Sequence, residues 1–176
     1  MLVRAAVHHF FKGRKNRGRG SPLCWGDWIN MKTSKNTLFP IDFSESSKKI
    51  IPYVITMAQA FQGQVHLLYV VRDFRYLSSF HVPHPSLDRL ENEVLENAQK
   101  MISRVGEENF NACITKVLTG DAAHVIIDYA QTEKIDLIIM GTHGRKGLDR
   151  TFFGSVAENV VKNAPVPVMV INPYKV

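Results

Sequence analysis

The sequence predicts an α/β protein in which crossover helices join the strands of a parallel sheet. From Met31 onward, short runs rich in β-branched and aromatic residues alternate with segments of helical periodicity, as expected for such a sheet. A length of 176 residues suits one hydrophobic core, and 45% apolar with 22% charged residues is the balance of a globular protein. No apolar run approaches the roughly 18 residues of a membrane span, so a membrane protein is not expected.

Strands and helices are expected in strict alternation along residues 31–176. The strands are predicted at residues 37–42, 64–71, 112–118, 136–141 and 166–171. The clearest helix carries an apolar stripe at spacings of three and four, formed by Leu87, Leu90, Val94, Ala98, Met101 and Val105. The other helices are predicted at residues 44–61, 121–133 and 155–164.

Two places along this pattern are less regular. Pro52 lies inside the first helix, where it removes one hydrogen bond, so a kink or a late helix start is expected. Residues 72–86 lack a periodicity of their own and are expected to form a long loop. His81 and His84 lie three apart in this loop, but the neighbouring prolines exclude a helix and no carboxylate or thiol is adjacent. No metal site is therefore expected.

Residues 1–30 differ in composition from the rest of the chain and form a separate basic tail. They carry six of the 22 basic and one of the 16 acidic residues, so residues 31–176 have a net charge of only +1. Residues 12–22 are rich in Gly and Arg, have no apolar periodicity and are expected to be disordered. The tail has three interpretations: a nucleic-acid-binding arm, a targeting segment, or residues outside the functional protein.

Cysteine usage points to a reducing environment. Cys24 and Cys113 are far apart and show neither metal nor redox spacing, so a disulfide framework is not expected. The default expectation is a cytoplasmic protein.

The most informative stretch is residues 140–158, where a predicted strand ends at Gly141 and a helix opens at Ser155. Gly141 and Gly144 permit positive φ and a close approach of the backbone to a ligand. The first turn of the helix presents unpaired N–H groups at the positive end of its dipole, which suits a phosphate. Ser155 and Glu158 also have the spacing of a capping box. The two roles are compatible, because a hydroxyl can accept from an amide while it donates to a phosphate.

The spacing Gly141-x2-Gly144-x9-Gly154-Ser155 resembles the G-x2-G-x9-G-[ST] motif of the ATP-binding universal stress proteins. Residues 36–45 look like the first strand of that family, and residues 165–171 look like its last. The resemblance covers residues 31–176 and leaves the tail unexplained. It implies a Rossmann-like three-layer sandwich, with helices on both faces of a five-stranded parallel sheet of order 3-2-1-4-5. It also implies bound ATP, with or without Mg²⁺.

The implied strand order reverses between the first and fourth strands, and ligands of open α/β sheets bind at the carboxyl ends of the strands there. By resemblance, Pro40 and Asp42 line the nucleoside, Asp42 accepts from ribose or adenine, and the backbone of Val70 meets adenine. The resemblance assigns the phosphates to Gly141, His143, Gly144, Gly154, Ser155 and Val156. Met140 and Thr142 are further candidates for ligand contact. Asp42 also has a structural alternative, as the N-terminal cap of the following helix.

The favoured function is an ATP-binding stress or regulatory module. The alternatives are a slow Mg²⁺-dependent ATPase and a nucleic-acid-binding protein that uses the tail. The chain contains no G-x4-G-K-[ST] loop, and efficient phosphoryl transfer needs metal ligands, a positioned nucleophile and cationic groups. No catalytic residue is therefore assigned, and turnover below about 1 s⁻¹ is expected. The resemblance further implies a homodimer through the last strand, whose apolar edge requires a cover.

Overall fold

The computed structural model describes residues 35–72, 84–142 and 154–175, apart from the side chains of residues 84–88. Strands and helices alternate along these residues as the sequence predicts. The elements are β1 (Asn36–Pro40), α2 (Glu45–Phe61), β2 (Gln64–Val71), α3 (His84–Asn109), β3 (Cys113–Thr119), α4 (Ala122–Thr132), β4 (Leu137–Gly141), α5 (Ser155–Asn163) and β5 (Val168–Ile171).

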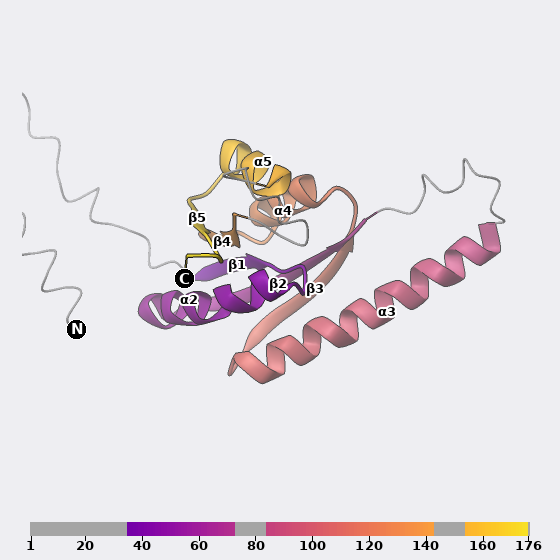
Figure 1. Cartoon of the computed structure of the whole chain (residues 1–176), viewed down its shortest axis with the longest axis horizontal. Coiled ribbons are helices and arrows are strands. Elements are labelled where there is room, and N and C mark those ends of the chain that lie inside the picture. Colours follow the sequence, from indigo (N-terminus) through magenta and orange to yellow (C-terminus); the bar gives the residue numbers. More distant parts are fainter. Residues whose placement is uncertain (1–34, 73–83, 143–153, 176) are drawn as a thin grey trace, which may run out of the picture. The chain divides into compact units, whose positions relative to one another are not determined.

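The five strands form one parallel sheet of order β3-β2-β1-β4-β5. Helices α2 and α3 cover one face of the sheet, and α4 and α5 cover the other (Figure 1). The predicted α/β three-layer sandwich and its strand order are therefore confirmed.

Each face of the sheet has its own apolar core, because successive strand residues point to opposite faces. On the α2 and α3 face, the buried side chains include Phe39, Leu67, Ile139, Ile50, Val54 and Ile102. On the α4 and α5 face, they include Leu38, Leu68, Ile138, Met140, Ile126 and Val160. The central strands are buried on both faces, which explains their nearly continuous apolar sequences.

Two polar side chains lie inside these cores. His66 on β2 is buried, and its Nδ1 lies 3.1 Å from the hydroxyl of Tyr129 on α4. Burial lowers the pKa of His66, since desolvation disfavours the imidazolium. Thr37 on β1 is fully buried, and within the described residues its Oγ1 has no hydrogen-bond partner. These two groups make the interior sensitive to pH and to polar substitution.

The late helix start, one of the two outcomes predicted at Pro52, is wrong, and so is the exclusion of a helix by the prolines near His84. Helix α2 begins at Glu45 and continues through Pro52, so the late start is excluded. Pro52 is exposed, so the backbone carbonyl four residues earlier, which receives no hydrogen bond from the proline nitrogen, lies on the solvent side. Helix α3 begins at His84 with Pro85 in its first turn, so prolines do not exclude a helix there. A proline is tolerated in the first turn because its missing N–H would have no partner inside the helix.

The strand boundaries differ from the predicted ones by up to two residues. Strand β1 ends at Pro40 rather than at residue 42, which leaves Asp42 in the turn that follows. Strand β5 begins at Val168, directly after Pro167, whose carbonyl still accepts from Ile138 N–H at 3.0 Å. Only β2 has the predicted ends.

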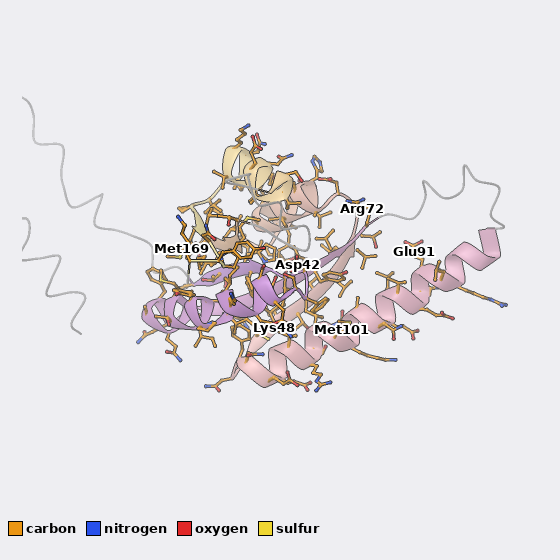
Figure 2. All side chains as sticks on the ribbon, viewed as in Figure 1. Asp42, Lys48, Arg72, Glu91, Met101 and Met169 are labelled. Atoms are coloured by element: carbon orange, nitrogen blue, oxygen red, sulfur yellow. The ribbon has the colours of Figure 1, made fainter. Side chains whose placement is uncertain are left out.

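Some large apolar side chains remain exposed on the described surface. Met169 lies on the edge strand β5, and Met101 lies on the long helix α3 (Figure 2). Val161 on α5 and Tyr174 after β5 are exposed as well. Within the described residues, no helix is both long and apolar enough to cross a membrane.

Candidate functional site

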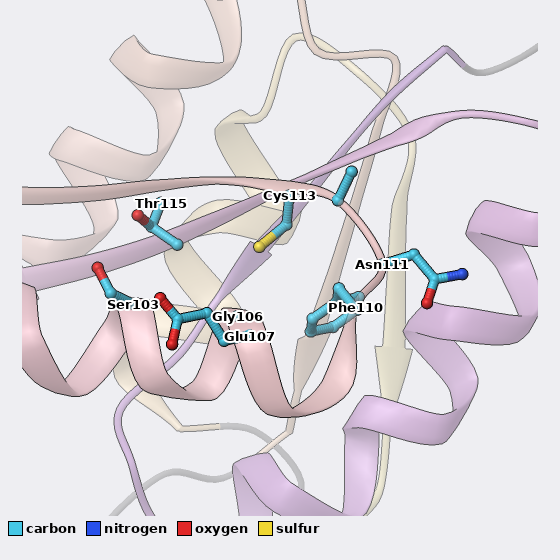
Figure 3. A pocket seen from close by; sticks show the side chains of 8 residues that line it. Ser103, Gly106, Glu107, Phe110, Asn111, Cys113 and Thr115 are labelled. Atoms are coloured by element: carbon cyan, nitrogen blue, oxygen red, sulfur yellow. The ribbon is translucent and has the colours of Figure 1, made fainter.

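An open cavity of about 410 Å³ lies between the C-terminal half of α3 and the start of β3 (Figure 3). It is lined by Ser103, Gly106, Glu107, Phe110, Asn111, Ala112, Cys113 and Thr115. Burial raises the pKa of the Cys113 thiol, so the unreactive protonated form is favoured. No residue that the sequence nominates lies in this cavity. The nominated residues gather instead at the carboxyl ends of the central strands.

The first feature of that region is an early end to the pairing between β1 and β4. The two strands pair only through Thr37 with Leu137 and Leu38 with Ile138, although both continue further. Ile41 N–H donates to Leu68 C=O at 2.9 Å on β2, so by alternation the backbone of Pro40 faces β4. Proline has no N–H, and the next ladder bond to β4 cannot form. The strand-order reversal therefore coincides with two central strands that no longer bridge each other.

The second feature is the backbone of Val70, which lies beyond the end of β1. Pairing between β1 and β2 stops at Pro40 and Leu68, while β2 continues to Val71. Because Leu68 bonds toward β1 and alternate residues face the same neighbour, the N–H and C=O of Val70 also point to the β1 side. Its side chain packs against the core on the α4 and α5 face. Val70 thus presents a backbone donor and a backbone acceptor beside the point where the strand order reverses.

The third feature is the junction of β4 with α5. Thr142 N–H donates to Ile171 C=O at 2.9 Å, and Thr142 C=O accepts from Gly154 N–H at 2.6 Å. These bonds place the start of α5 against the end of β4, on the face where Met140 is buried. Ser155 is exposed, and Val156 packs against the same core. His143 and Gly144, nominated for the phosphates, lie outside the described residues.

The helix α5 opens at Ser155 as predicted, but the predicted capping box is wrong. Gly154, not Ser155, is the N-cap, and Gly154 C=O accepts from Glu158 N–H at 2.9 Å. The Oε1 of Glu158 accepts from Lys162 Nζ at 2.7 Å. The sequence permits positive φ at Gly141, but Gly141 is a strand residue, and among the described glycines Gly120 alone has positive φ.

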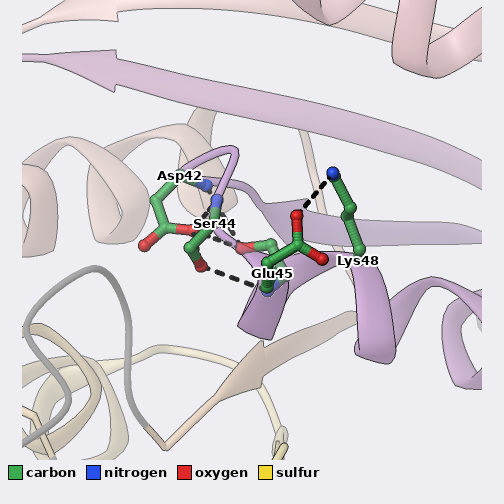
Figure 4. A network of polar contacts seen from close by, with 5 residues as sticks. Asp42, Ser44, Glu45 and Lys48 are labelled. Carbon is green, nitrogen blue, oxygen red and sulfur yellow. Dashed lines mark hydrogen bonds and ion pairs between the residues drawn. The ribbon is translucent and has the colours of Figure 1, made fainter.

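The carboxylate of Asp42 is held by the start of α2 (Figure 4). Its Oδ1 accepts from Ser44 N–H at 3.0 Å, from Ser44 Oγ at 2.6 Å and from Ser47 Oγ at 2.5 Å. The N-cap of α2 is Ser44, whose Oγ accepts from Ser47 N–H at 3.2 Å, so the alternative of Asp42 as the cap is wrong.

The residue after Asp42 has an unusual backbone. Phe43 has φ of 59°, in the left-handed region that bulky residues rarely adopt. Its ring packs on Tyr69 of β2, with a centroid distance of 4.6 Å. Strain of this kind persists only where the surroundings hold it, and it is concentrated at functional sites. The turn that carries Asp42 is therefore fixed both by the serine hydroxyls and by an aromatic contact.

The structure brings most of the nominated residues to one edge of the sheet. Three neighbouring strands carry these residues at their carboxyl ends: Pro40 and Asp42 at the end of β1, Val70 on β2, and the Met140–Thr142 segment at the end of β4. The adjoining helix begins with Gly154, Ser155 and Val156. The sequence argument missed Phe43, Ser44 and Ser47. The serines could have been found from their positions two and five residues after Asp42, a spacing that places both at a helix start. Within the described residues, no cluster of three His, Cys, Asp or Glu side chains could hold a metal.

Comparison with known proteins agrees with this architecture. The family model described as "Universal stress protein family" matches residues 33–172. The chain belongs to the universal stress protein family. A relative from Methanocaldococcus jannaschii, universal stress protein MJ0531, is 34% identical over 145 residues, which are 80% of this chain and 84% of that protein.

Solved structures of universal stress proteins share the fold. The structure of MJ0577, also from Methanocaldococcus jannaschii, is 30% identical, with a TM-score of 0.67 over 80% of this chain and 96% of that one. A universal stress protein solved in complex with cAMP is 16% identical, with a TM-score of 0.54 over 80% of this chain and 98% of that one. At that identity, the second likeness concerns the fold alone.

Proposed function

We propose that this universal stress protein binds an adenine nucleotide, with ATP as the principal ligand, at the carboxyl ends of β1, β2 and β4. The observation that carries the proposal is that three kinds of group meet where the strand order reverses. They are the fixed carboxylate of Asp42, the backbone N–H and C=O of Val70, and the N-terminus of α5. A nucleotide has matching groups: ribose hydroxyls, an adenine edge and a phosphate chain. A universal stress protein with this fold has been solved in complex with cAMP.

The nucleoside end is assigned to β1 and β2. Asp42 accepts from ribose or adenine donors, and the backbone of Val70 pairs with the adenine edge. Pro40 supports this end because its missing N–H interrupts the β1 and β4 ladder. Met140 lies on the same face of the sheet and is a candidate for contact with the base.

The phosphate end is assigned to the start of α5. The first N–H groups of a helix have no intrahelical acceptor, and the N-cap Gly154 has no side chain to cap them. Ser155 adds a hydroxyl at the first helical position, while Gly141, Thr142, Gly154 and Val156 supply backbone. Anions are stabilised at such a terminus by the N–H groups and the helix dipole together. His143 and Gly144 complete the proposed phosphate contacts from the sequence motif.

The protein is proposed to act as a cytoplasmic binding module in a stress response, with hydrolysis slow or absent. Mg²⁺ would come with the bound nucleotide, and the sequence contains no Walker-type loop to hold it. A homodimer is proposed through β5, where exposed Met169 lies on an apolar edge strand. Residues 1–30 are proposed to be dispensable for the domain at residues 31–176, and binding of nucleic acid would require them.

The decisive experiment places a side chain at Gly154. Its backbone angles, φ −71° and ψ 155°, are open to valine, so Gly154→Val introduces no left-handed strain. We expect ATP to bind at least tenfold more weakly, about 1.4 kcal/mol, in isothermal titration calorimetry. Asn163→Val provides the control, since Asn163 is exposed at the opposite end of the same helix. An unchanged ATP affinity in a folded Gly154→Val protein would contradict the proposed phosphate site.

The alternative function, an ATPase, is tested with the unaltered full chain, ATP and Mg²⁺. Steady-state phosphate release is expected to stay below about 1 s⁻¹. Faster release that is lost in His143→Ala, while ATP still binds, would replace the binding module with an enzyme.

A further inference from the structure

The hydroxyl of Ser47 is committed to one neighbour. Ser47 is the third residue of α2 and is 7% exposed. Its Oγ donates to Asp42 Oδ1 at 2.5 Å and accepts from Asp42 N–H at 3.4 Å. Both partners belong to the same residue, so the hydroxyl links the backbone and the carboxylate of Asp42 across the strained turn at Phe43.

Capping of the helix does not require this hydroxyl. Ser44 already caps α2 by accepting from Ser47 N–H, which needs only the backbone of Ser47. In a capping box the third helical residue would be Glu or Gln and would accept from the N-cap N–H. Here Asp42 takes that bond from Ser44 N–H at 3.0 Å. The Ser47 hydroxyl is therefore left to orient Asp42.

We propose that Ser47 is a positioning residue that fixes the Asp42 carboxylate for the nucleoside of the bound nucleotide. The inference rests on the proposed function and names a residue that the glycine motif does not contain. A carboxylate that three hydroxyl and amide donors hold in one rotamer is ready to accept from a ribose or adenine group. Without Ser47 the carboxylate loses one of the two hydroxyl donors to its Oδ1, so more of its ordering must accompany ligand binding.

The consequence is confined to one end of the ligand. Ser47 contacts Asp42 at the end of β1, whereas the proposed phosphate contacts lie at the end of β4 and the start of α5. Loss of the hydroxyl should therefore weaken ligands that carry a nucleoside and spare a bare phosphate chain. A loss of overall folding would weaken both.

The test measures binding of ATP and of inorganic tripolyphosphate by calorimetry to the full chain. We expect Ser47→Ala to weaken ATP about tenfold and to leave tripolyphosphate unchanged. Ser46→Ala is the matched control: it makes the same chemical change one residue earlier on α2, and no hydrogen bond to Asp42 is found for Ser46 in the described structure. Ser47→Cys, which fills the same space with a weak donor, covers the case in which the alanine variant does not fold.

A double-mutant cycle separates positioning from a general structural effect. In an Asp42→Ala background, Ser47→Ala should cause little further loss of ATP affinity, because the carboxylate that Ser47 positions is gone and only the 3.4 Å bond from the backbone N–H of residue 42 is left. An ATP affinity within twofold of the parent in either folded Ser47 variant would overturn the inference, as would an equal loss in the Asp42→Ala background. Failure of the parent protein to bind ATP would instead overturn the proposed function.

Discussion

Alanine in place of Gly106 on α3 is expected to destabilise the protein, because α3 packs closely on β3 at that point. A Cβ at this position would lie 2.7 Å from Cys113 Sγ and 3.2 Å from Thr115 Cγ2 (Figure 3). Distances under 3.0 Å force one group to move, and overpacking of this kind costs about 1–3 kcal/mol. Within a helix, alanine in place of glycine contributes about 1 kcal/mol in the opposite direction. Gly106→Ala should therefore destabilise the protein by up to about 2 kcal/mol.

Removing Cys113 Sγ should reverse the sign. In a Cys113→Ala background the shortest contact is gone, and Gly106→Ala should then stabilise the fold by about 0.5–1 kcal/mol through helix propensity. The difference between the two backgrounds is the coupling energy, expected to be about 1–3 kcal/mol. Urea unfolding followed by circular dichroism measures it for the four proteins.

The reasoning fails if Gly106→Ala has the same effect in both backgrounds within about 0.5 kcal/mol, the usual limit of additivity. A change in the slope of free energy against urea would point instead to an altered denatured state. The affinity for ATP should be equal in all four proteins, because the cavity between α3 and β3 is separate from the proposed nucleotide site.

Three further outcomes are expected. Thr37→Val should raise the free energy of unfolding by about 1 kcal/mol in urea melts, because it removes a buried hydroxyl that has no hydrogen-bond partner within the described residues. Burial lowers the pKa of His66 in the folded state, so the unfolded state binds the proton more tightly. The stability that neutral His66 contributes is complete above pH 6.5, the ordinary pKa of histidine, and is lost as the pH falls. Urea melts across that range should show this loss and should show a flatter profile in His66→Phe. A chain that begins at Met31 should keep both its melting temperature and its ATP affinity, and loss of either would show that residues 1–30 contribute to the domain.

Much of the fold was predictable because burial leaves a clear signal in this chain. Strand β2 is apolar on both faces, and its predicted ends match the observed ones. The periodic stripe predicted α3, but the helix extends to His84 and Asn109, beyond the residues that carry the stripe. Prolines were the main source of error in the predicted helices, since the effect of a proline on a helix or strand depends on whether its missing N–H would have had a hydrogen-bond partner. That property follows from helix position and strand register rather than from local sequence.

The sequence offered two reasons for glycines at the candidate site, positive φ and a close approach of the backbone to a ligand. Gly154 caps α5 with ordinary backbone angles, and Gly141 continues a strand, so neither needs left-handed backbone. What both positions share is the lack of a Cβ beside the end of β4. Space for a ligand is therefore the better explanation, and it is the explanation that Gly154→Val tests.

Pro40 shows why the nucleoside end of the site could not be derived from the sequence. A proline at the end of a buried strand leaves one ladder hydrogen bond unmade if its nitrogen faces a neighbouring strand. The register shows that the nitrogen of Pro40 faces β4. That one missing donor stops the pairing of the central strands at the point where the strand order reverses. Three residues later the chain turns at Phe43, and Ser44 and Ser47 hold Asp42 beside the interrupted ladder. Each step depends on register or on side-chain contact, so only the fold reveals that the interrupted ladder and the fixed carboxylate lie at the same end of the sheet.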